Sequence, residues 1–371
     1  MKRCARWLMA ICIATVGNAA WAEPSSMGES IPPGEQVAIA DIIASISRGY
    51  AQRTPTVKRM AHAKHHGCVR ATFTVDNVPI DLRQGVFAKP LGTSFKAWMR
   101  LSNGSANEQH DSVPDTRGFA IKLIGVPGKK LMPDECDTQD FLMHNAPIFL
   151  VRDVASFAKY MALGADPGVA SLLKAIQAIS KEKPAEFARE AALGAQIVTT
   201  PIENPLLIPY YSALPASVGS QPVKFAVRPC VTGRDKIPFS ARHPAPVHMN
   251  FLRESMKKQL DVTDACFEFF VQRRSALKDM PIEDPTVEWN QDTAPFVRVA
   301  TIHIPKQSFD SDKQMAFCQD LAFTSWHTLA EHRPLGGINR LRKAAYEFSS
   351  KTRHKMNAAT LVEPTGDEVF K

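Results

Sequence analysis

Short segments of alternating apolar and polar residues stand on either side of one long helical stretch, and this arrangement constrains the fold most. A period of two is typical of half-buried strands. Such segments are Ala71–Val75, Phe95–Leu101, Gly118–Ile124, Val223–Arg228, His248–Leu252, Phe267–Arg273 and Val297–Ile304. Helical spacing occurs over Val37–Gln52, over Val154–Val198 and from about Ser311 onward. Because strands and helices do not alternate as βαβ units, the pattern predicts an α+β fold, an antiparallel β-barrel or sheet with surrounding helices.

The first 22 residues have the features of a secretory signal peptide. Lys2, Arg3 and Arg6 precede an apolar run over Trp7–Val16, and Ala20-Trp21-Ala22 is a small-x-small cleavage signal. We therefore expect an exported, periplasmic protein whose mature part, residues 23–371, forms a single domain of 371 − 22 = 349 residues. No later segment has the eighteen or so consecutive apolar residues of a membrane-spanning helix, so no membrane partner is expected.

Charge and cysteine content exclude several classes of protein. The formal net charge is +8, which becomes +5 when the three basic residues of the leader are removed. The remaining basic residues are scattered, which argues against binding to nucleic acid. Five cysteines follow the leader, and none forms a C-x-x-C pair, so zinc-ribbon, thioredoxin and c-type haem motifs are absent. Spacing alone does not indicate which cysteines pair.

The last helical stretch carries an unusual group of residues. It follows Pro334-Leu335-Gly336-Gly337, and Asn339 is a plausible N-cap. At 100° per residue, Arg342, Tyr346 and Arg353 fall at roughly 0°, 40° and 20°, on one face. Two arginines on the face of a tyrosine favour its phenolate, a known axial ligand of haem iron. The alternative is an amphipathic surface helix whose arginines are solvated.

A second candidate segment lies near the start of the chain. His62, His65 and His66 have a spacing that a helix could turn into a metal site, although no carboxylate or fourth ligand is nearby. They could equally be exposed polar residues. A third interpretation is that His62 alone acts, as a general acid–base beside a cofactor.

Five segments, in order from about residue 50 to residue 358, resemble the motifs of the catalase family. They are Arg59-x-x-His62-Ala63-Lys64, Arg100-Leu101-Ser102 followed by Asp115-x-Arg117-Gly118-Phe119-Ala120-x-Lys122, His144-Asn145-Ala146-Pro147 through Arg152-Asp153, Asp284-x-Thr286-x-x-Trp289, and Arg342-x-x-x-Tyr346.

The resemblance implies haem b as cofactor and assigns a role to eight residues. Tyr346 would be the iron ligand, with Arg342 behind it. Arg59, Arg100 and Arg353 match the arginines that hold the haem propionates, which suits bidentate pairing with carboxylates. His62 would be the distal acid–base, Ser102 would orient its ring, and Asn145 would donate a hydrogen bond to bound peroxide.

The departures from the family pattern indicate a smaller enzyme. About 25 residues follow Tyr346, Phe348 and Ser349 replace an aspartate and a threonine, and Leu150 stands where an aromatic residue is common. The chain resembles small exported catalase-related peroxidases. We expect reduction of hydrogen peroxide or organic hydroperoxides with an organic electron donor, and a monomer or small homo-oligomer.

Two other functions fit the same scaffold. One is a fatty-acid hydroperoxide isomerase, against which Ala61 argues because it offers no hydroxyl beside His62. The other is a non-catalytic haem carrier or sensor. A carrier does not need His62, Ser102 and Asn145 together.

Overall fold

The computed structural model describes residues 27–51, 57–163, 202–230 and 248–370, with residues 184, 185, 188 and 192. The signal peptide expected over residues 1–22 lies outside the described residues. So does most of the helical stretch expected up to Val198.

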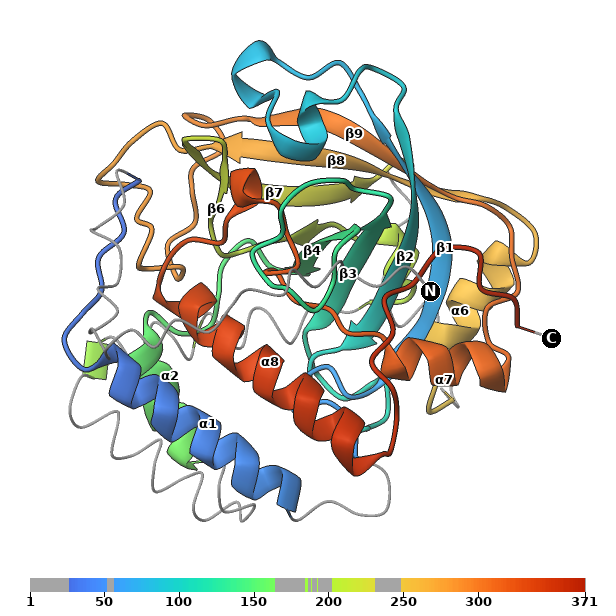
Figure 1. Ribbon diagram of the computed structural model, residues 1–371, viewed down its shortest axis with the longest axis horizontal. Coiled ribbons are helices and arrows are strands. Elements are labelled where there is room, and N and C mark those ends of the chain that lie inside the picture. The colour runs from blue at the N-terminus through green and yellow to red at the C-terminus, as the bar shows by residue number, and fades with distance from the viewer. Residues whose placement is uncertain are drawn as a thin grey trace, which may run out of the picture.

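An antiparallel β-barrel forms the centre of the molecule (Figure 1). The order of strands is β5-β4-β3-β2-β1-β9-β8-β7-β6, and a further pairing of β5 with β7 closes eight of them into a ring. The strands are β1 (His65–Val75), β2 (Ser94–Asn103), β3 (Arg117–Ile124), β4 (Thr138–His144), β5 (Tyr210–Tyr211), β6 (Ala216–Val218), β7 (Gln221–Pro229), β8 (Ala265–Arg273) and β9 (Phe296–Ile304). The expected antiparallel barrel with surrounding helices is confirmed.

The barrel interior is the main hydrophobic core. Alternate residues of each strand point inward, as a period of two requires. Aromatic rings fill the centre. The ring centre of Phe141 lies 5.0 Å from that of Phe269 and 5.1 Å from that of Phe225, and both pairs pack edge to face. With the odd-numbered residues of β2 inside, its even-numbered residues, which include Arg100 and Ser102, are left for the outer face.

Helices cover the outside of the barrel (Figure 1). The helix α8 packs against α1, and α1 packs against α2, so that the first and last long helices of the chain meet. The α-helices are α1 (Glu35–Ala51), α2 (Val154–Leu163), α6 (Phe251–Leu260), α7 (Asp312–Asp320) and α8 (Gly337–Met356). Short 3-10 helices are η1 (Ile80–Leu82), η2 (Gly85–Ala88), η3 (Pro205–Leu207) and η5 (Ala330–His332).

Two sequence predictions about elements were wrong. The strand expected at His248–Leu252 is a turn followed by the start of α6. Helix α8 begins at Gly337, and its N-cap is Gly336 with φ +87°, a backbone region that favours glycine. Asn339 therefore lies inside the helix, where its side chain donates hydrogen bonds to the carbonyls of Pro215 and Leu335.

Two disulfides join described cysteines. Cys68 of β1 is bonded to Cys318 of α7, and Cys230 is bonded to Cys266 of β8. The first bridge spans 250 positions of the sequence and the second spans 36.

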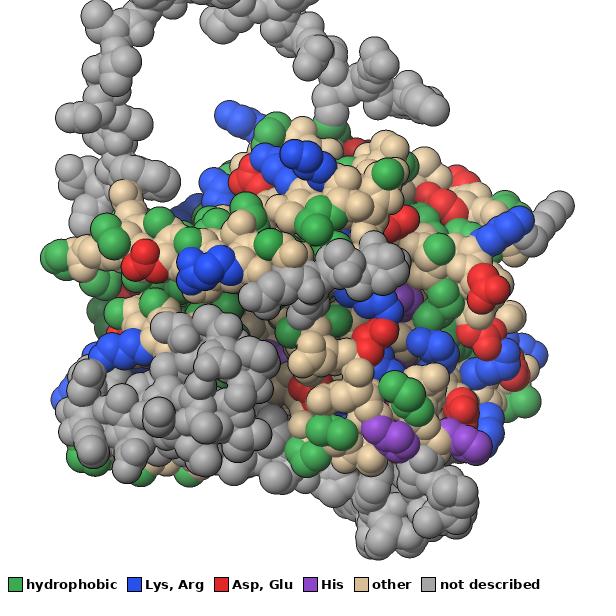
Figure 2. All heavy atoms as spheres, turned by 90° about the horizontal axis from the view of Figure 1, so that it is seen from below, with side chains coloured by type: hydrophobic (Ala, Val, Ile, Leu, Met, Phe, Trp, Pro, Cys, Tyr) green, Lys and Arg blue, Asp and Glu red, His purple; other side chains and the backbone are tan. Residues whose placement is uncertain are grey.

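The described surface shows no long block of one charge on the face in Figure 2. Basic and acidic side chains are interspersed there among apolar ones. No helix within the described residues is both long enough and apolar enough to cross a membrane.

Candidate functional site

Two of the predicted site residues, Arg100 and Ser102, project from the outer face of the barrel, and their partners on the neighbouring antiparallel strand project to the same side. One cross-strand row is Ser102, Gly118 and His144, and the next contains Arg100 and Ala120. Gly118 and Ala120 carry little or no side chain, so this part of the face leaves room for a side chain from elsewhere in the chain. The register of β2, β3 and β4 thus places small residues between the polar ones.

His62 lies beside the first row. Its Nδ1 atom is 3.1 Å from Oγ of Ser102. Its backbone has a φ of +57°, and its N–H donates to the carbonyl of Gly104 at 2.9 Å. A Cβ atom on Gly118 would stand 2.5 Å from Nδ1 of His62, so the imidazole occupies space that only glycine leaves free. Ser102 and Gly118 together fix the plane of the ring.

The surroundings keep the His62 ring neutral. Burial, together with the charges of Arg100, His144 and Arg342, lowers the pKa of His62 to about 3. A neutral ring that donates its Nδ1 proton to Ser102 has an unprotonated Nε2. Such a ring can accept a proton at Nε2 and return it.

Asn145 is held by the backbone of β3. Its Oδ1 accepts a hydrogen bond of 2.7 Å from the N–H of Arg117, and its own N–H donates to the Arg117 carbonyl at 3.1 Å. The Arg117 guanidinium in turn donates to Oδ1 of Asn103 at 2.6 Å and to the carbonyl of Asp111 at 2.9 Å. Because the oxygen of the Asn145 amide is engaged, its nitrogen is the end left to donate elsewhere.

Tyr346 lies on α8 in contact with Arg342. Nε of Arg342 donates to the phenol oxygen at 3.3 Å, and the guanidinium stands 5.1 Å from the centre of the ring. Asn339 accepts a bond of 3.4 Å from Nη1 of Arg342. Arg353 shares the helix but turns to another partner, helix α7. Of the three residues predicted to share one face of the helix, Arg342 and Tyr346 therefore contact each other, whereas Arg353 contacts α7.

Three arginines meet at the carboxyl end of α7, and we call Arg59, Arg100 and Arg353 the arginine cluster. The carbonyl of Gln319 accepts hydrogen bonds from Nη1 of Arg59 at 3.0 Å and from Nη1 of Arg353 at 2.6 Å. The Leu321 carbonyl also accepts from both. Carbonyls in the last turn of a helix lack partners within the helix and carry partial negative charge.

Arg100 joins the cluster from the barrel wall. It is 4% exposed, and its Nη2 donates to the carbonyl of His62 at 2.7 Å. Burial and the nearby charge of Arg353 together lower the pKa of Arg100 to about 9. The pKa of Arg59 is held well below its ordinary value by burial and by the charges of Arg100 and Arg353.

Within the arginine cluster, Arg100 and Arg353 have little negative charge near them among the described residues. Among the described residues, Asp320 is the carboxylate nearest to Arg353, at 3.8 Å, and its side chain is 44% exposed. Nε of Arg100 and Nε of Arg353 are buried without a hydrogen-bond acceptor. Buried like charges with unsatisfied donors are costly unless an anion completes them. The donor set therefore fits a group that brings carboxylates, such as a haem with its two propionates.

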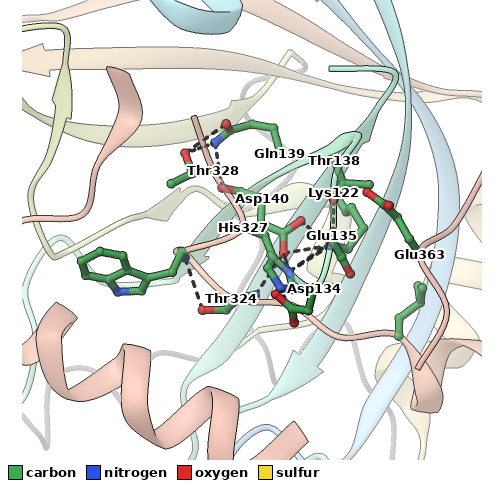
Figure 3. A network of polar contacts seen from close by, with 12 residues as sticks. Lys122, Asp134, Glu135, Thr138, Gln139, Asp140, Thr324, His327, Thr328 and Glu363 are labelled. Atoms are coloured by element: carbon green, nitrogen blue, oxygen red, sulfur yellow. Dashed lines mark hydrogen bonds and ion pairs between the residues drawn. The ribbon is translucent and has the colours of Figure 1, made fainter. Parts of the chain in front are cut away.

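A second charged cluster lies one row further along the same face (Figure 3). We call the residues Lys122, Asp134, Glu135, Asp140 and His327 the lysine–histidine network. Nζ of Lys122 contacts Glu135 and lies 2.8 Å from Asp140. His327 Nε2 is 3.0 Å from Asp134, and Nδ1 is 3.1 Å from Glu135. Two cations thus lie among three carboxylates.

The lysine–histidine network keeps its charges in place. Burial and Lys122 act to lower the pKa of His327, but hydrogen bonds to Asp134, Asp140 and Glu135 raise it to about 11. Despite burial, Lys122 and His327 hold the pKa of Glu135 at about 2. Glu135, Asp140 and His327 could by spacing hold a metal ion. Nζ of Lys122 already supplies a cation to both carboxylates.

This network also positions α8. Oδ2 of Asp140 accepts a bond of 3.0 Å from the N–H of Thr324, and the N–H of Asp140 donates to the carbonyl of His327 at 2.8 Å. From the same segment, Nε1 of Trp326 donates to the carbonyl of Asn339 at 2.8 Å. Strand β4 is therefore connected through this segment to the start of the helix that carries Tyr346.

Sequence reasoning missed several of these residues and misplaced others. His65 and His66 belong to strand β1, with Nδ1 of His65 and both ring nitrogens of His66 buried without partners. The helical metal site considered for His62, His65 and His66 is therefore wrong. The sequence gave no indication that His327 or the α7 carbonyls belong to the site, because their partners are distant in sequence. Gly118 belonged to a recognised motif, but only the structure shows what its missing side chain accommodates.

Comparison with known proteins agrees with this architecture. Residues 30–165 match the family model of catalase. Comparison with curated proteins gave no match. A fungal catalase structure has a TM-score of 0.65 and 14% identity, covering 89% of this chain and 66% of the other. Catalase A from Saccharomyces cerevisiae has a TM-score of 0.63 and 16% identity, and the match covers 88% of this chain and 69% of the other. A bacterial catalase has a TM-score of 0.59 and 13% identity, and the match covers 92% of this chain and 65% of the other.

The fold is that of catalases. The match to the catalase family model covers residues 30–165 of the 371 in the chain. The chain spans about two thirds of the length of the catalases that it matches.

Proposed function

We propose that the protein is a haem-dependent oxidoreductase that reduces hydrogen peroxide or organic hydroperoxides. The observation that carries this proposal is the arginine cluster, two of whose buried members have little negative charge near them among the described residues, beside a neutral His62 whose ring is fixed by Ser102. Tyr346 and Arg342 would hold the iron side of the haem. Arg59, Arg100 and Arg353 would hold its carboxylates. When bound, the haem supplies the redox-active iron that exchanges electrons with peroxide.

The residues of the chain would handle the proton. Nε2 of His62 can take the proton of a peroxide and return it to the oxygen that leaves, which turns a poor leaving group into water or an alcohol. The amide nitrogen of Asn145, whose oxygen is held by Arg117, would donate a hydrogen bond to the developing charge. The low pKa of His62 keeps its acceptor form present at neutral and mildly acidic pH.

Two variants test these assignments separately. Tyr346→Phe should weaken haem binding or change the absorption spectrum, because it removes the proposed ligand while keeping the ring. His62→Ala should retain haem yet react slowly with hydrogen peroxide in stopped-flow measurements. An unchanged spectrum in the first variant would refute the ligand role. Reaction with peroxide at the wild-type rate in the second variant would show that His62 is not the acid–base.

We propose further that organic hydroperoxides are substrates. Leu150, a few residues after Asn145, has 41% of its surface exposed, which supports an open approach to this side of the site. A site rejects large substrates only where its walls exclude them. Turnover of tert-butyl hydroperoxide with a phenolic donor should therefore be measurable beside hydrogen peroxide dismutation. Rapid dismutation with no turnover of the alkyl compound would overturn this part.

The two disulfides support export to an oxidising compartment, which we propose to be the periplasm. Fractionation of cells that produce the full chain tests this. The mature protein should begin after Ala22, and N-terminal sequencing would show that directly.

A further inference from the structure

The disulfide between Cys68 and Cys318 joins β1, the strand that pairs with the strand of Arg100, to α7, whose last carbonyls bind Arg59 and Arg353. We propose that this disulfide is a positioning device, which holds the carboxyl end of α7 where Arg59 and Arg353 bind it and thereby raises affinity for a dicarboxylate ligand. The inference rests on the proposed function, in that the dicarboxylate is taken to be a porphyrin.

One end of the bridge is fixed to the strand opposite Arg100. Cys68 and Arg100 are direct partners in the pairing of β1 with β2, so their side chains project from the same face of the barrel. Both are buried, at 0% and 4% exposure. A displacement of β1 or of the element bonded to Cys68 would therefore be felt at Arg100.

The other end is fixed immediately before the carbonyls that the arginines use. Cys318 precedes Gln319, whose carbonyl accepts bonds from Arg59 and Arg353. The next carbonyl, that of Asp320, lies 2.8 Å from Nε2 of His354. These last-turn carbonyls form one platform for side chains from before β1 and from the end of α8. Its position depends on where α7 is held against the barrel.

Other contacts also hold α7 against the barrel, among them Phe317 of α7, whose ring centre lies 5.0 Å from that of Trp98. Nε2 of Gln314, one turn earlier in α7, donates to the carbonyl of Cys68 at 2.9 Å. Apolar packing comes from the small cluster that contains Trp98, Leu321 and the two cysteines. Against these contacts stands the mutual repulsion of three buried guanidinium groups. A covalent bond keeps the arginines oriented in the absence of ligand, and preorganisation of this kind increases affinity.

The molecule offers a matched control. Cys230 and Cys266 form the second disulfide, at the ends of the paired strands β7 and β8, where the N–H of Cys230 also donates to the carbonyl of Cys266. Cys266 lies on β8 and Cys230 directly follows β7, whereas Arg100 lies on β2 and Arg353 lies on α8. Removing this bridge also relaxes the unfolded chain, but it leaves α7 in place.

The test compares Cys68→Ala/Cys318→Ala with Cys230→Ala/Cys266→Ala, using metal-free protoporphyrin IX and its dimethyl ester as probes. Fluorescence titration gives affinity without enzyme activity and without iron ligation by Tyr346. We expect the first variant to lose about tenfold in affinity for the dicarboxylate, since ordering of the arginines is no longer built in. The affinity of the same variant for the ester should fall by about twofold or less. The affinity of the control variant for each probe should also fall by about twofold or less.

Each other outcome is decisive. Equal losses for acid and ester, or equal losses with the two disulfide variants, would reduce the bridge to a general stabiliser and overturn the inference while leaving the proposed function intact. If the unmodified protein binds neither probe, both proposals fall. If Cys68→Ala/Cys318→Ala does not fold, Cys68→Ala/Cys318→Val restores apolar volume without the bond. Wild-type affinity in that repacked variant would again overturn the inference.

Discussion

The arginine cluster and the lysine–histidine network lie on one face of the same barrel, and they treat charge in opposite ways. In the network, Lys122 and His327 each meet carboxylates at hydrogen-bond distance. In the cluster, Arg100 and Arg353 are buried with Nε atoms that have no acceptor. A charge network with its counterions inside needs no ligand. A cluster that lacks internal counterions is arranged to bind a ligand that supplies them.

The largest effect should come from breaking the network. Lys122→Met leaves Glu135 and Asp140 with less positive charge in a buried place, so the free energy of unfolding should fall by about 3–5 kcal/mol. Urea denaturation measures this. The control is Lys96→Met, which removes the pair of Lys96 with Asp367, side chains that are 60% and 73% exposed, and should cost less than about 1 kcal/mol. Equal losses of stability in the two variants would mean that burial does not increase the contribution of the network to stability.

A smaller effect of different kind should follow removal of a cluster arginine. Arg100→Met takes away a buried charge that lacks a counterion, so the stability of the ligand-free protein should change little. Affinity for a dicarboxylate porphyrin should fall by about thirtyfold, or about 2 kcal/mol, because one charged partner is lost. Arg298→Met, which removes an exposed arginine paired with Glu268, is the control for affinity. A large loss of stability with unchanged affinity would contradict the distinction between the clusters.

The smallest effect, taken for a single pH unit, is a dependence of stability on pH. The pKa of His327 is raised from its ordinary value of about 6.5 to about 11, so its stabilising charge is fully present below about pH 6.5 and is lost as pH rises toward 11. The stability advantage of wild type over His327→Gln should therefore shrink by about 1 kcal/mol for each pH unit between 7 and 9. Denaturation at pH 6, 7, 8 and 9 measures it. An advantage that grows with pH would show that His327 is neutral in the folded protein.

Local sequence patterns predicted much of the barrel, but not its closure. Strands such as Phe267–Arg273 alternate clearly because one face is the barrel core. Strand β4 escaped notice, since Gln139 and Asp140 are polar yet fully buried, so its residues do not alternate between inside and water. Closure depends on the two-residue strand β5, which is too short to carry a pattern.

For the site, resemblance located the residues and the structure supplied their partners. His62 and Ser102 are 40 positions apart, and no local pattern could state that they lie 3.1 Å from each other. Helical periodicity placed Arg353 on the same helix face as Tyr346, and the structure shows that its side chain contacts α7. Long-range contacts of this kind depend on how helices dock on the barrel, and helical periodicity does not specify that docking.

The bridge between Cys68 and Cys318 also has a consequence for the order in which a newly made chain can oxidise. Synthesis delivers Cys68 first and its partner 250 residues later, after Cys136, Cys230 and Cys266 have all appeared. Cys230 and Cys266, only 36 residues apart, can join much sooner. A chain that oxidised its cysteines in order of appearance would pair Cys68 wrongly. Correct assembly of the arginine cluster therefore depends on Cys68 remaining reduced, or on exchange of an early bridge, until the last part of the chain has emerged.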